Sequence, residues 1–153
     1  MKVLLLGSIG VLAETSDLQR QAYNEAFAAQ GLDWRWNIAT YCHHLTTPGG
    51  LRRLRTLFGD RLADRDIEQI HDNKQAFFER RLAGGISPRA GIRETVDMAR
   101  SHGLTLGLIT TTTPRTLAIM RRALADALDF DAFHLITSKA DVRQEKPHPE
   151  VYE

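Results

Sequence analysis

The residues best suited to chemistry in this sequence are four consecutive threonines at positions 110–113, which follow an apolar segment. The hydroxyl group of Thr110 and the backbone N–H of Thr111 would offer two neighbouring hydrogen-bond donors, a combination that binds oxyanions such as phosphate. A second interpretation is that the threonines only join a β-strand to a loop, because threonine favours extended structure. On the residue types alone, the second interpretation is favoured.

Lys146 is the second candidate, because it stands directly before Pro147 in a Lys-Pro-His-Pro segment. Prolines stiffen a turn and would aim the lysine side chain in one direction. An ammonium group aimed in this way suits contact with an anion. The alternative is an exposed surface lysine that precedes a proline turn.

The composition predicts a soluble globular protein with one domain, or with a small core domain that carries an inserted subdomain, in 153 residues. A formal net charge of +1 gives no reason to expect nucleic acid or an anionic membrane as a partner. The single cysteine, Cys42, allows no disulfide within the chain and suggests a cytoplasmic location. The adjacent His43 and His44 cannot share one helix face, and no zinc site is predicted.

The hydrophobic pattern predicts an α/β fold in which strands alternate with helices through parallel crossovers. The expected strands are 3–6, 104–110 and 133–136, and the first is a continuous apolar run of the kind found in buried parallel strands. The expected helices are 16–30, one from about 37, 51–58, 67–78, 92–99 and 115–128. Ligands of such sheets bind at the carboxyl ends of the strands, where residues 7–10, 110–113 and 137–146 should meet.

These three segments resemble, in order, the first three motifs of the haloacid dehalogenase-like (HAD) phosphatases. The similarity is strongest to the CbbY-type branch, whose members act on sugar phosphates and include xylulose-1,5-bisphosphate phosphatases. It covers essentially the whole chain, and the stretches that carry it are 12–15, 22–27, 31–36, 110–113 and 146–152.

The resemblance implies a HAD-like Rossmannoid parallel sheet, incomplete at its C-terminal side, with an inserted all-helical cap. The core would be 1–15 and 86–153, and the cap 16–85. Thr110 and Lys146 would contact the phosphate group. Substrate contacts are expected from Thr111, Glu14, Arg53 and Lys74, although a solvated helix charge is an equally good interpretation of Arg53 and Lys74. The cap motif is only partly kept, because Pro48, Leu51 and Gln19 replace the Thr, Lys and His of relatives.

The first motif departs from the family pattern where its two catalytic aspartates belong. Gly7 stands at the position of the nucleophile and Ile9 at that of the general acid/base. The hydroxyl of Ser8 is one residue out of register and, in an extended segment, would point to the opposite face. A fourth motif, which supplies a further Mg²⁺ carboxylate in the family, is not reached before Glu153. We therefore expect a pseudoenzyme that binds phosphate or a phosphate ester with negligible hydrolysis and no Mg²⁺.

Two alternatives remain open. Without the later strands, Val3–Leu6 would be an open apolar sheet edge, which is a site for strand addition, so the chain could be an interaction module that forms a homodimer or recruits another polypeptide. The chain could also be an active sugar-bisphosphate phosphatase whose first motif or chain end is altered, with Mg²⁺ as its cofactor.

Overall fold

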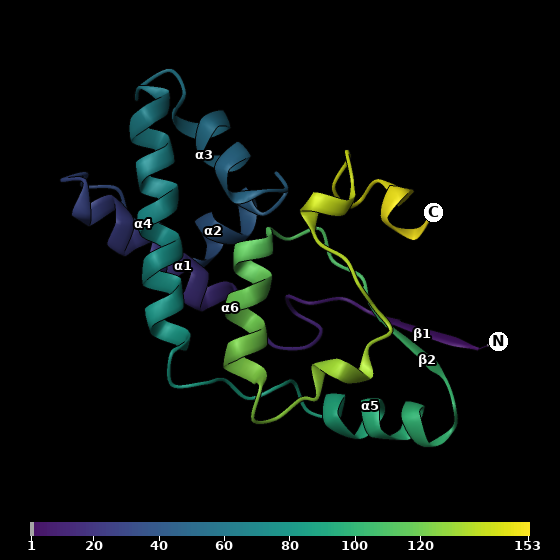
Figure 1. Ribbon diagram of the computed structural model, residues 1–153. Coiled ribbons are helices and arrows are strands. Elements are labelled where there is room, and N and C mark those ends of the chain that lie inside the picture. The colour runs from purple at the N-terminus through teal and green to yellow at the C-terminus, as the bar shows by residue number, and fades with distance from the viewer. Residues whose placement is uncertain (1) are drawn as a thin grey trace. The chain divides into compact units, whose positions relative to one another are not determined.

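The computed structural model describes residues 2–153 (Figure 1). Its chain divides into two compact units, one of the residues up to Thr15 together with Leu82–Glu153, and the other of Ser16–Arg81. None of the helices within the described residues is long and apolar enough to cross a membrane.

The first unit is built on a parallel sheet whose strands follow the order β1-β2-β3. Strand β1 is Val3–Leu6, β2 is Thr105–Leu108 and β3 is Leu135–Ile136, and Leu4 pairs with Leu106 while Leu108 pairs with Ile136. Helix α5 (Ile92–Ser101) precedes β2, and helix α6 (Pro114–Leu124) follows it. The predicted α/β fold with parallel crossovers is confirmed.

The end of α6 and the short strand β3 differ from the prediction. The helix was expected to reach residue 128 but ends at Leu124, and β3 contains only Leu135 and Ile136. The intervening segment forms a 3₁₀ turn, η1 (Phe130–Ala132), because the Asp129 side chain accepts a hydrogen bond from the Asp131 N–H at 2.9 Å. Two more 3₁₀ turns follow β3, η2 (Lys139–Asp141) and η3 (Pro149–Tyr152).

The two faces of the sheet are covered differently. Leu106 and Leu108 are fully buried against the core formed with α5 and α6, and Leu4 and Leu6 pack on the same face. Side chains alternate along a strand, so the next residues along each strand lie on the other face. There Val3, Leu5 and Leu135 are 47%, 46% and 55% exposed. This second face is apolar and open to solvent.

The second unit consists of helices α1 (Ser16–Ala29), α2 (Ile38–His44), α3 (Gly50–Phe58) and α4 (Asp64–Leu82). Helix α2 begins where predicted, because the Asn37 side chain accepts a hydrogen bond from the Thr40 N–H at 2.8 Å. The unit has its own aromatic core, in which Trp34 stacks on Phe58 with ring centroids 4.0 Å apart. Trp34 and Trp36 both pack in this aromatic core.

We expect the Leu108→Ala substitution to lower the free energy of unfolding by about 2–5 kcal/mol, because it leaves a cavity in the buried face. The matched variant Leu135→Ala should change it by less than about 1 kcal/mol, since that leucine is already more than half exposed. Urea denaturation followed by circular dichroism measures both. Equal losses would show that the second face is covered in solution.

Candidate anion-binding site

The turn after β1 is held in place by residues far along the chain. The N–H groups of Val11 and Leu12 both donate to the Ser8 carbonyl, so the chain leaves the extended conformation directly after the strand. From the segment before α5, the Arg89 guanidinium donates to the Gly10 carbonyl at 3.0 Å, and its backbone N–H donates to the Leu12 carbonyl at 2.8 Å. The sequence pattern did not predict that Arg89 holds this turn.

The Ser8 side chain lies at the centre of the strand ends. The residue is buried, and its Oγ lies 2.8 Å from Oγ1 of Thr110. Strand β1 pairs with β2 through Leu6 and Leu108, and two residues further along the chain Ser8 and Thr110 are still neighbours. That the Ser8 side chain points to the face opposite to that of Gly7 stays a prediction.

Thr110 is fixed from two neighbouring strands. Its N–H donates to Oγ1 of Thr137 at 2.9 Å, and the same hydroxyl donates back to the Thr110 carbonyl at 2.9 Å. The Thr112 N–H donates to the Thr110 hydroxyl at 3.2 Å. Side chains from the ends of β1, β2 and β3 thus meet around the Thr110 backbone.

Lys146 reaches the same place from the segment after β3. Its Nζ donates to the Ile109 carbonyl at 2.6 Å and lies 5.3 Å from the centre of the Tyr152 ring. Its backbone N–H donates to the Thr111 hydroxyl at 3.2 Å. The structure therefore brings together Thr110, Thr111 and Lys146, the three residues that the sequence proposed for anion binding.

The loop that presents Lys146 is braced by charged groups. Lys139 donates its N–H to the Thr112 carbonyl at 2.8 Å, and its ammonium pairs with the buried carboxylate of Glu145. The Glu150 carboxylate accepts the N–H groups of Arg143 and Gln144, each at 2.9 Å. These backbone hydrogen bonds favour the ionised form and lower the pKa of Glu150 from its ordinary value of 4.5.

The residues present do not fit a magnesium ion. Mg²⁺ is usually bound through one or two carboxylates, whereas positions 7–10 offer a glycine, a serine, an isoleucine and a second glycine. Residues 2–153 contain no group of three or more His, Cys, Asp and Glu side chains that could hold a metal ion. A side chain at Gly7 would itself be crowded, because its Cβ would stand 3.2 Å from Cγ2 of Val11.

The other predicted substrate contacts have different surroundings. Glu14 is exposed, with its carboxylate 3.7 Å from the Arg89 guanidinium. In the helical unit, the buried Arg53 donates to the carbonyls of His44 and Thr47 at 2.8 and 3.0 Å. Lys74, 3% exposed, donates to Oε1 of Gln19 at 3.0 Å. Neither Arg53 nor Lys74 is a solvated helix charge, and a role for them in substrate binding stays a prediction.

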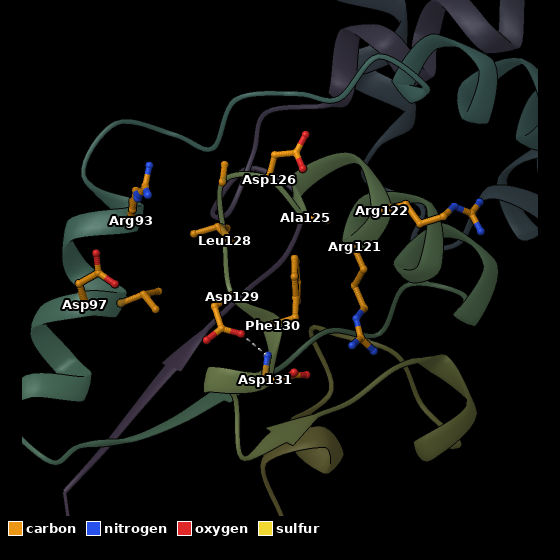
Figure 2. Close-up of a pocket in the computed structure, with 12 residues that line it drawn as sticks. Arg93, Asp97, Arg121, Arg122, Ala125, Asp126, Leu128, Asp129, Phe130 and Asp131 are labelled. Carbon is orange, nitrogen blue, oxygen red and sulfur yellow. Dashed lines mark hydrogen bonds between the residues drawn. The ribbon is translucent and has the colours of Figure 1, made fainter.

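A cavity of about 620 Å³ lies elsewhere in the first unit (Figure 2). It is lined by Arg93, Val96 and Asp97 of α5 and by residues within 121–131, and its charged groups have both signs. It sits at the C-terminal end of α6, whereas the threonines stand at the N-terminal end. At 1.5 Å of rise per residue, the two ends are roughly 17 Å apart, so this cavity is separate from the anion-binding site.

Comparison with known proteins gives a consistent result. A family model described as haloacid dehalogenase-like hydrolase matches residues 1–153. Protein CbbY of Rhodobacter capsulatus is 37% identical, and the match covers 99% of this chain and 69% of that protein. Protein CbbY of Cereibacter sphaeroides is 33% identical, and the match covers 99% of this chain and 68% of that protein. Crystal structures of CbbY from Rhodobacter sphaeroides, one with phosphate and one of a variant with xylulose-(1,5)bisphosphate, superpose with TM-scores of 0.87. Both are 33% identical and cover 99% of this chain and 69% of theirs.

We expect Thr137→Val to destabilise the protein by about 1–3 kcal/mol, because it leaves the N–H of buried Thr110 without its hydroxyl partner. The two side chains have nearly the same shape, so loss of packing contributes little. Thermal and urea unfolding measure the effect. Thr105→Val, at a partly exposed position of β2, serves as the control and should leave stability within about 0.5 kcal/mol.

Proposed function

We propose, from the premise that the chain belongs to the haloacid dehalogenase-like hydrolase family, that it binds phosphate or a sugar phosphate with little or no hydrolysis. The observation that carries the proposal is the meeting of Thr110, Thr111 and Lys146 at the carboxyl ends of the strands. Hydroxyl groups, backbone N–H groups and an ammonium are the donors that oxyanions require.

The charge at the site favours an anion. The Lys146 ammonium is held by a carbonyl and an aromatic ring, neither of which carries a formal charge. The neighbouring Lys139 differs, because Glu145 already neutralises it. One positive charge is thus left at the strand ends for a ligand oxygen.

The ligand class is supported by the similar proteins. The CbbY protein of Rhodobacter sphaeroides was crystallised with phosphate and, as a variant, with xylulose-(1,5)bisphosphate. We propose the same class of ligand for this chain, with Thr111, Glu14, Arg53 and Lys74 as further contacts. The role of the helical segment 16–85 as a specificity-giving cap and a cytoplasmic location stay predictions.

Little or no hydrolysis follows from the residues at the first motif. Phosphoryl transfer on this scaffold begins with a carboxylate nucleophile, and Gly7 has no side chain. Ile9 cannot transfer a proton to the leaving group through its side chain. Loss of a nucleophile costs about 10⁶ in rate in a well-studied hydrolase.

We expect inorganic phosphate to raise the melting temperature. At a phosphate concentration a hundredfold above Kd, binding should increase the free energy of unfolding by about 2.7 kcal/mol. Lys146→Gln should abolish this rise, whereas Lys2→Gln, at an exposed position outside the site, should leave it unchanged. The titration uses matched ionic strength with sodium chloride.

The same samples, with and without Mg²⁺, are assayed for phosphate release from xylulose and ribulose bisphosphates, and we expect none. Release by the unmodified chain would establish the alternative of an active phosphatase. Absence of any phosphate-dependent shift would refute the binding proposal.

A second candidate function is protein association through β1, and a specific observation favours it. Within the described residues β1 pairs only with β2, so its outer edge is unpaired. The strand contains only apolar residues, and Val3 and Leu5 lie half exposed on the open face of the sheet. Unpaired apolar edges accept a further strand, either from a second copy or from another polypeptide.

If a second copy adds to this edge, sedimentation velocity should show association that increases with protein concentration. Leu5→Lys should prevent it, because a charged side chain on an edge strand opposes strand addition. Met98→Lys, at a 61% exposed position of α5, is the matched control. A monomer at every concentration would contradict self-association.

A further inference from the structure

We propose that Ser8 is a ligand-binding residue of the anion site, and that it acts with Thr110 as one hydrogen-bonding unit. This inference rests on the proposed binding of phosphate. It goes beyond it by assigning a role to a residue in the altered first motif, between Gly7 and Ile9. Ser8 is the only residue of positions 7–10 whose side chain carries a polar group.

The geometry of the pair supports this role. The two hydroxyl oxygens are 2.8 Å apart, which is the usual length of an O–H···O hydrogen bond. Ser8 is 6% exposed and Thr110 is 5% exposed, so bulk water does not readily satisfy either group. The pair joins the end of β1 to the end of β2, at the edge of the sheet where Lys146 also arrives.

The number of protons decides what the pair can do. Each hydroxyl has one proton to donate and two lone pairs to accept. One of the two protons forms the bond between Ser8 and Thr110, and either residue can be its donor. Thr110 also accepts the Thr112 N–H. Among residues 2–153, the structure gives the second hydroxyl proton no acceptor.

A ligand oxygen can therefore take that second proton. If Ser8 donates to Thr110, the Thr110 proton is available, and if Thr110 donates to Ser8, the Ser8 proton is available. The unit thus offers one donor in either arrangement. Its preferred ligand is an acceptor without protons to give, and a phosphate monoester dianion meets this description.

This reasoning predicts strong non-additivity. Ser8→Ala leaves the Thr110 proton for the ligand, and Thr110→Val leaves the Ser8 proton, so each single variant should weaken phosphate binding by no more than about twofold. The double variant retains neither proton, so its affinity for phosphate should fall at least about tenfold. This is the effect expected from losing one hydrogen bond to a charged group. Independent contributions would give only the product of the single losses.

The experiment is a double-mutant cycle in the full chain, with inorganic phosphate as the probe and isothermal titration calorimetry as the measurement. Ser8→Thr, which keeps a hydroxyl, should retain the affinity of the unmodified protein. Thr112→Val, which removes a neighbouring hydroxyl outside the pair, should stay within about twofold. If the double variant does not fold, it is replaced by Ser8→Ala/Thr110→Cys, in which the cysteine thiol is a weaker donor than the threonine hydroxyl. This variant is compared with Thr110→Cys alone.

Three results would overturn the inference. A double-variant loss no larger than the product of the single losses would show that the two hydroxyls do not act as a unit. If Thr110→Val abolished phosphate binding and Ser8→Ala had no effect on it, the proposed function would stand but Ser8 would have no part in it. Absence of phosphate binding by the unmodified protein would overturn both this inference and the proposed function.

Discussion

The backbone of Thr110 is the point on which the site depends. Its N–H and its carbonyl are both bonded to the hydroxyl of Thr137, and its side chain is bonded to that of Ser8. Buried backbone groups must find partners, so β2 cannot end elsewhere without breaking these bonds. Because three strand ends share this one residue, the turn at 110–113 and the arrival of Lys146 are determined together.

The charges at the site are the basis for proposing binding with little or no hydrolysis. Where a carboxylate nucleophile would be needed, the chain has Gly7, and its nearby buried carboxylate, Glu145, is already engaged with Lys139. The groups that face a ligand are neutral hydroxyls, N–H groups and one ammonium. Such a set suits a bound oxyanion, and positions 7–10 contain no carboxylate to act as nucleophile or as general acid/base.

Much of this arrangement was predictable from sequence, and the exceptions have identifiable physical causes. Apolar periodicity located the helices of Ser16–Arg81 and the positions of the strands along the chain, because these are local patterns. Ser8 and Thr137 were missed because their partners lie 102 and 27 residues away. The end of α6 was misplaced for a local reason, because the Asp129 side chain caps the start of the 3₁₀ turn η1.

Strand β1 shows how the two candidate functions can coexist. Its sequence is apolar on both faces, which is the pattern of a parallel strand covered on both sides, yet only the face with Leu4 and Leu6 meets the core. The face with Val3 and Leu5 is therefore suited to a cover. A strand added at the outer edge of β1, or a cover on this face, would lie along the sheet, whereas the candidate anion site lies at the strand ends. Association there and phosphate binding at Thr110 need not compete, and a cover that stiffened β1 would also hold Ser8 more firmly against Thr110.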